Sequence, residues 1–156
     1  MADSTPYALS QLFSNLIDRR VSVAEASMQE ATKCRKSYAS YDVVGRNEKI
    51  FLQIDFDLLG SLGGALAGMP DSIIRQNLKA MPFDETLRDA MHEILNIVSA
   101  VITTEGRAIL KMMELDENKG RALAQNFAQT TPHFVSRFQA AIPNYLGGQI
   151  EVLSPI

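Results

Sequence analysis

The chain has 156 residues, of which 46% are hydrophobic and 21% are charged, and its formal net charge is −3 at pH 7. This usage is that of an ordinary globular protein and excludes a largely disordered chain. Basic residues are scattered among acidic ones, so neither a nucleic acid nor a membrane surface is an expected partner. We expect a single domain over residues 1–156.

Cysteine usage and apolar runs indicate a cytoplasmic protein. Cys34 is the only cysteine, so the chain forms no internal disulfide and offers no cysteine cluster for a metal. The first residues lack the basic segment and long apolar run of a secretory signal peptide. The longest apolar stretch, 58–69, contains four glycines and is too short to cross a bilayer.

Helices and strands alternate along the first half of the chain. Thr5 and Pro6 suit the start of a helix, and apolar residues then follow one helical stripe from Leu9 to Ile17. Further on, a turn separates two segments in which apolar and polar residues alternate, which predicts a hairpin with one buried face. The remaining predictions for this half are a strand over 21–26, hairpin strands over 38–44 and 49–56, and helices over 57–68 and 71–79.

The second half echoes the first. Asp84 can cap a long amphipathic helix that runs to about Thr103. Residues 107–115 fit either a strand or a helix. The remaining segments predict a helix over 118–129 and a second hairpin over 134–141 and 148–153.

The glycine-rich segment 60–68 has two interpretations. Its start, Gly60-Ser61-Leu62-Gly63-Gly64, follows a predicted strand, as a phosphate-binding loop would. It has neither the glycine spacing of a dinucleotide-binding fingerprint nor the Gly-Lys-Ser/Thr of a P-loop. Small residues that let a helix approach the sheet closely are therefore favoured.

The long helix presents one polar pair of interest. At 100° per residue its apolar side chains share an arc of about 160°. Glu93 and Asn96 lie on the remaining arc, three residues apart, so they are neighbours on the helix surface. A carboxylate and a carboxamide therefore point outward together, where they can engage a partner's lysine and hold a water molecule.

A polar face without any function would also account for this pair. Such a face is expected of any amphipathic helix, although an asparagine inside a helix is unfavourable unless it caps. His92-Glu93 opens like the zinc-protease motif HExxH, but Asn96 stands where the second histidine is required, so zinc is rejected. Neither histidine has the serine or cysteine motif of a hydrolytic triad beside it.

The order of elements, with the run Ala-Met-His-Glu-Ile-Leu-Asn-Ile-Val-Ser-Ala at 90–100, resembles the CheC/CheX/FliY family of chemotaxis phosphatases, and CheX most of all. The resemblance covers most of the chain in its order of elements and about ten residues in motif. It implies an α+β fold with a mostly antiparallel sheet, long amphipathic helices and pseudo-repeated halves.

The same resemblance implies a function. The family removes phosphate from the aspartyl phosphate of response-regulator receiver domains. Asn96 would then orient the attacking water, and Glu93 would pair with the receiver's lysine. Mg²⁺ would belong to the receiver, so no cofactor of the chain's own is expected.

Two features depart from the family pattern. Leu95 stands where a glycine usually precedes the asparagine, and Ile97 and Val98 stand where small residues usually follow it, so bulkier side chains are expected to hinder close approach of a receiver. A second pair found on the first helix of some relatives is replaced here by Gln11 and Ser14.

Two alternatives stay open beside the phosphatase. One is a non-catalytic interaction or adaptor module in two-component or chemotaxis signalling. The other is a fold relative with a different role, such as sensing a small molecule. Exposed sheet edges would also allow a homodimer.

Overall fold

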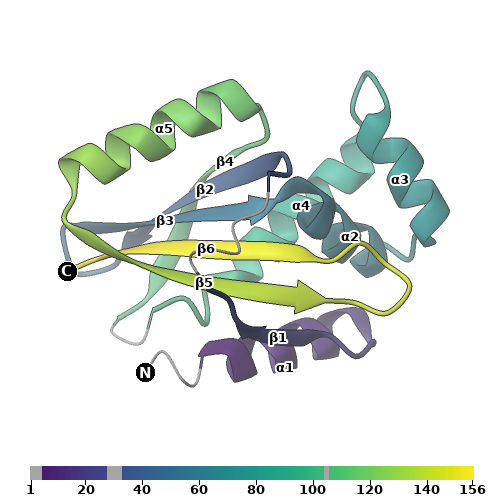
Figure 1. Ribbon diagram of the computed structural model, residues 1–156, viewed down its shortest axis with the longest axis horizontal. Helices are drawn as coiled ribbons and strands as arrows, with labels where there is room; N and C mark the ends of the chain where they lie inside the picture. Colours follow the sequence, from purple (N-terminus) through teal and green to yellow (C-terminus); the bar gives the residue numbers. More distant parts are fainter. Residues whose placement is uncertain (1–4, 28–32, 104–105) are drawn as a thin grey trace.

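The computed structural model describes residues 5–27, 33–103 and 106–156. Within these ranges the chain forms one six-stranded antiparallel sheet with helices on both faces (Figure 1). The strands are β1 (Ser22–Glu25), β2 (Lys36–Val43), β3 (Glu48–Asp55), β4 (Ala108–Glu114), β5 (His133–Ala141) and β6 (Gly148–Pro155). The helices are α1 (Thr5–Ile17), α2 (Phe56–Leu66), α3 (Asp71–Lys79), α4 (Glu85–Val98) and α5 (Glu117–Thr130).

The strands follow the order β1-β5-β6-β3-β2-β4, so each half of the chain places its single strand beside the hairpin of the other half. Each half supplies one hairpin, β2–β3 or β5–β6, and the two hairpins pair through β3 and β6 at the centre. The single strand of each half, β1 or β4, pairs with the hairpin of the other half. This arrangement confirms the predicted antiparallel α+β fold, including its pseudo-repeated halves. The segment 107–115, which fitted a strand or a helix, contains strand β4.

One face of the sheet, which we call the core face, is covered by α1, α2 and α4. Fully buried side chains from each of these helices, among them Phe13, Leu62 and Met91, pack against Leu52 and Ile54 of β3 in one cluster. The alternation of apolar residues in the hairpin places these strand residues inward, as predicted.

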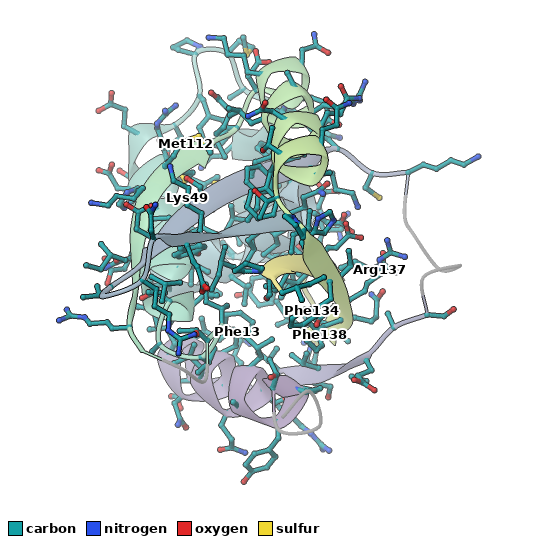
Figure 2. The ribbon with its side chains drawn as sticks, turned by 90° about the vertical axis from the view of Figure 1, so that its left-hand side faces the viewer. Phe13, Lys49, Met112, Phe134, Arg137 and Phe138 are labelled. Atoms are coloured by element: carbon teal, nitrogen blue, oxygen red, sulfur yellow. The ribbon has the colours of Figure 1, made fainter. Side chains whose placement is uncertain are left out.

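The opposite face is covered by α5, which corrects the prediction of a hairpin with a single buried face. Tyr38, Phe51 and Leu153 form a second buried cluster with Phe127 of α5. The rings of Phe51 and Phe127 stack with their centroids 5.6 Å apart. Figure 1 shows α5 and α1 on opposite sides of the sheet, and in Figure 2 Lys49 and Met112 lie on the α5 side. Phe51 was the overlooked signal, since it is an aromatic side chain on the supposedly polar face.

The glycines of α2 serve close packing, although their neighbours are helices and not the sheet. A Cβ added at Gly60 would stand 2.5 Å from a methyl carbon of Leu78, and one at Gly64 would overlap Ile74. Both neighbours belong to α3. The whole stretch 58–64 is buried inside a regular helix, so its geometry is that of a packing surface and not of a phosphate-binding loop.

Two further contacts fix the first part of α4. The Asp84 side chain accepts a hydrogen bond of 2.8 Å from the backbone N–H of Leu87, which caps the helix start as predicted. A Cβ added at Gly63 would stand 2.9 Å from the backbone nitrogen of Met91, so α2 and α4 are in backbone contact.

None of the helices in the described ranges is both long enough and apolar enough to cross a membrane.

Tyr41 ties the last part of α4 to the sheet. Its buried hydroxyl donates a hydrogen bond of 2.7 Å to the backbone carbonyl of Leu95. Burial raises the pKa of this hydroxyl well above its ordinary value, because the phenolate would be deprived of water. The Tyr41 side chain therefore stays neutral at ordinary pH and keeps donating this hydrogen bond. The bond fixes the separation between α4 and β2.

Gly120→Ala is expected to destabilise the protein by about 1–3 kcal/mol. The added Cβ would overlap the ring of Tyr38, so α5 must move away from the sheet. Thermal unfolding measures the effect. The matched control is Asn118→Ala, an exposed change on the same helix that should stay within about 0.5 kcal/mol of the parent. Equal unfolding temperatures for the two variants would contradict the close packing.

Tyr41→Phe is expected to lower the free energy of unfolding by about 1–3 kcal/mol near neutral pH, because the Leu95 carbonyl loses a buried donor. The raised pKa adds a pH dependence. Above the ordinary tyrosine value of 10.0 the unfolded state ionises while the folded state stays neutral. The stabilisation is therefore complete below about pH 10 and is lost as the pH rises further. Urea unfolding at a series of pH values should show the two proteins converging above about pH 10, and a constant difference would contradict the role of Tyr41.

Candidate functional site

The candidate site is the outward face of α4, in the last turns of the helix. Leu87, Met91, Ile94 and other members of its apolar stripe are buried, so the helix presents its polar stripe to solvent. Glu93 and Asn96 are both exposed, as the angular count predicts. The structure thus brings the two predicted residues together on one surface, one helical turn apart.

Neither side chain of the pair is engaged within the described part of the chain. The Glu93 side chain has no hydrogen bond or ion pair there, and Asn96 is bonded only through its backbone. The neighbouring His92 and Asp89 are exposed as well. A carboxylate and a carboxamide with no internal partner are available to another molecule.

The end of α4 corrects the predicted helix. The helix ends at Val98 and does not run to Thr103. Beyond it the backbone N–H groups of Ser99, Ala100 and Val101 each bond to the carbonyl three residues before, which tightens the chain into turns.

Asn96 therefore lies in the last turn of α4 and not in mid-helix. Its backbone carbonyl accepts a 2.5 Å hydrogen bond from the Ser99 hydroxyl. An asparagine is less unfavourable near a helix end than inside a helix, so the propensity argument for a functional Asn96 loses most of its force. Exposure and the absence of an internal partner are the observations that remain.

Leu95 does not occupy the exposed face. Its side chain is fully buried, and its carbonyl is the one held by Tyr41. Val98 is buried too, and Ile97 is half-buried. The obstruction expected from a leucine before Asn96 is therefore absent from the surface beside the asparagine.

The first helix carries no second pair. The hydroxyl of Ser14 accepts a 2.9 Å hydrogen bond from the backbone N–H of Val21, and that of Ser10 accepts one of 2.8 Å from Val23. The Ser14 hydroxyl thus holds the start of β1 beside α1, and Gln11 is exposed on a helix whose sequence contains no carboxylate. Of these two helices, only α4 presents a carboxylate and an amide in the expected order.

The chemistry open to this face is that of positioning. In the described residues no group of three or more His, Cys, Asp or Glu side chains is arranged to hold a metal ion. A carboxamide can accept a hydrogen bond from water and donate one at the same time, and a carboxylate can pair with a cation. The site could therefore orient a water and a lysine brought by a partner.

Sequence reasoning missed the residues that hold the site in place. The sequence indicates Tyr41 only as part of a predicted strand, and Gly63 only as a small residue in the glycine-rich segment. A signal for Tyr41 existed, because it shares the inward phase of its strand with Ala39 and Val43. A tyrosine at an inward position needs a partner for its hydroxyl. No comparable signal identifies which helix contacts Gly63.

No family model matches the sequence, and no curated protein matches it. Solved structures do match. The middle domain of FliM from Vibrio alginolyticus has a TM-score of 0.68 at 14% identity, over 98% of this chain and 89% of that one. FliY from Thermotoga maritima has a TM-score of 0.58 at 12% identity, over 97% and 84%.

CheX from Desulfovibrio desulfuricans has a TM-score of 0.52 at 11% identity, over 98% of each chain. The FliM domain thus superposes better than this CheX, and the expected preference for CheX has little support. At these identities the likeness concerns architecture. The chain has the fold shared by the CheC/CheX/FliY family and the middle domain of FliM.

Proposed function

We propose that the chain is a phosphatase for the aspartyl phosphate of a response-regulator receiver domain, with the exposed face of α4 as its docking and catalytic surface. The observation that carries the proposal is the pair Glu93 and Asn96, which is exposed, adjacent and without a partner in the described chain, on a helix fixed along its length. The architecture shared with CheX, a chemotaxis protein, makes a receiver the favoured partner.

Positioning is what this chemistry needs from the protein. Phosphoryl transfer to water depends on alignment and charge neutralisation more than on new covalent chemistry. Residues three apart on a helix have their Cβ atoms about 5–6 Å apart, so the two side chains can reach neighbouring groups in one partner. The contacts of Asp84, Gly63 and Tyr41 hold the α4 backbone still while the pair engages.

The proposed roles follow from the two functional groups. The Asn96 carboxamide oxygen accepts a hydrogen bond from the attacking water and aims its lone pair at phosphorus. A bond forms between the water oxygen and phosphorus, and the bond from phosphorus to the aspartyl oxygen breaks. The aspartate leaves as a carboxylate, and the protons of the water end on inorganic phosphate and solvent. Glu93 pairs with the receiver's lysine, and Mg²⁺ belongs to the receiver.

A second candidate is a docking module without catalysis. The FliM middle domain gives the higher TM-score, and FliM from H. pylori has been solved in a complex with FliG at a TM-score of 0.61 to this chain. In that case the same α4 face would bind a signalling partner, and Asn96 would contribute contact area alone.

Asn96→Ala is expected to lower the acceleration of receiver dephosphorylation by about 100-fold or more, since the water loses its alignment. The measurement is the loss of phosphate from a phosphorylated receiver of the same organism, with and without the protein. Asn126→Ala is the matched control, because it removes an exposed amide from α5. No acceleration by the parent protein with any receiver of the organism would remove the phosphatase and leave the docking module.

Glu93→Ala is expected to weaken binding to the receiver at least tenfold while Asn96→Ala leaves binding almost unchanged. The reason is that Glu93 supplies the charge that pairs with the lysine. Calorimetry with the receiver separates the two effects. Glu85→Ala is the control, since it removes an exposed carboxylate from the first turn of the same helix. Equal loss of binding in Glu93→Ala and Glu85→Ala would reduce the role of Glu93 to general surface charge.

A further inference from the structure

A second site of interest is a cavity of about 530 Å³ on the core face of the sheet. It lies at the end of the sheet where the β2–β3 turn is found, between the start of α1 and the turns that follow α4. None of the residues proposed for phosphatase chemistry lines it. Its described lining comes from four adjacent strands and from the segments beside them, as Thr5, Val43, Arg46, Glu48, Ile50, 101–103, Phe134, Ser136, Phe138, Val152 and 154–156.

The floor of the cavity is apolar, and two large apolar side chains stand at its edge. Ile50, Phe138 and Val152 line the floor and are almost completely buried. Phe134 and Ile156 stand beside them with 54% and 86% of their surface exposed. Figure 2 shows Phe134 and Phe138 on the same side of β5, together with Phe13 of α1. Large exposed apolar side chains beside a cavity favour an occupant that is itself apolar.

Two hydroxyl groups interrupt the apolar floor. Ser136 of β5 lies opposite Val152, and Ser154 of β6 lies opposite Phe134. Both line the cavity, both are partly buried, and neither side chain has a hydrogen-bond partner in the described part of the chain. A hydroxyl beside an apolar surface gains from a hydrogen bond, so the pair provides one polar point of attachment.

The charges of the lining balance. Arg46 and Glu48 are its charged members, and their side-chain nitrogen and oxygen lie 4.0 Å apart. The side chains of the described lining therefore carry no net charge for an ionic ligand to complement. An occupant with an apolar body and a neutral polar group satisfies all three features of the cavity.

We propose that this cavity binds a small, uncharged, amphipathic molecule. Its apolar body lies against Ile50, Phe138 and Val152, and one hydroxyl or carbonyl group bonds to Ser136 or Ser154. The volume falls in the range of about 300–1,000 Å³ that is usual for small-molecule sites. The site goes beyond the phosphatase and does not depend on it.

The test is a titration of the protein with 1-octanol, followed by the backbone amide signals in NMR spectra. Saturable shifts are expected at Ser136, Ser154 and Ile102, with α5 unaffected. The anion octanoate is expected to bind at least tenfold more weakly, because the cavity offers its carboxylate no net positive charge. Similar affinities for the two probes would contradict the neutral-ligand proposal.

Two variants localise the binding. Ser136→Leu fills the cavity and is expected to weaken octanol binding at least tenfold, whereas Ser22→Leu, on the exposed surface of β1, should leave it unchanged. Should Ser136→Leu fail to fold, as judged by circular dichroism, the double variant Ser136→Ala with Ser154→Ala keeps the volume and should still lower the affinity severalfold.

Several outcomes would overturn the proposal. Shifts that do not saturate up to the solubility limit, or undiminished binding to the folded serine variants, would show that the cavity is not a ligand site. A dimer in sedimentation that Ser136→Leu dissociates would assign the cavity to contact with a second copy of the chain.

Discussion

The antiparallel contact between β3 and β6 is the constraint on which the rest of the molecule depends. Four residue pairs, from Phe51–Leu153 to Ile54–Ile150, join the two halves of the chain along it. Side chains alternate along both strands, so the contact supplies buried residues to both faces of the sheet. A shift by one residue would turn each set to the wrong face, and the demand for burial on two sides therefore fixes the register.

This central contact also explains how the candidate face of α4 is placed. The core face made by the two hairpins supports α2, and α2 in turn supports α4 through Gly63, while Tyr41 reaches α4 directly from β2. The apolar side chains of its buried stripe hold α4 in place. The side chains of its exposed stripe are not needed for packing. Glu93 and Asn96 can thus serve a partner without a penalty in packing, which is how a rigid element best presents a site.

Much of this architecture could be predicted from the sequence, because the spacing of apolar residues and the residues at helix ends and turns indicate structure within short stretches of the chain. The alternation in 49–56, the stripe of α1 and the cap at Asp84 lie within a few residues of the structure they specify. Two of the errors concern contacts between distant segments. Phe51 is buried because α5 crosses the second face, which its aromatic side chain could have indicated, whereas no local pattern shows that the glycines of α2 face helices. The position of Glu93 and Asn96 followed from helical geometry, but the early end of α4 depends on hydrogen bonds that Ser99 makes with the preceding turn.

The serines of α1 have a consequence for the symmetry of the molecule. The two halves share a plan, yet their first helices have diverged in use: α1 holds its own strand through Ser10 and Ser14, whereas α4 is anchored by Tyr41 and Gly63 from the inside. Converting α1 into a second copy of the α4 face would require an asparagine at position 14, and that exchange would release the backbone of Val21 from its hydroxyl partner. Both helices are packed through their buried sides, α1 by Leu9, Phe13 and Ile17, so the difference between the halves lies in the polar side chains of α1 that bond to the chain leading into β1. The hydroxyl of Ser14 therefore ties the outward face of α1 to the fold, whereas the outward face of α4 carries no such tie in the described chain.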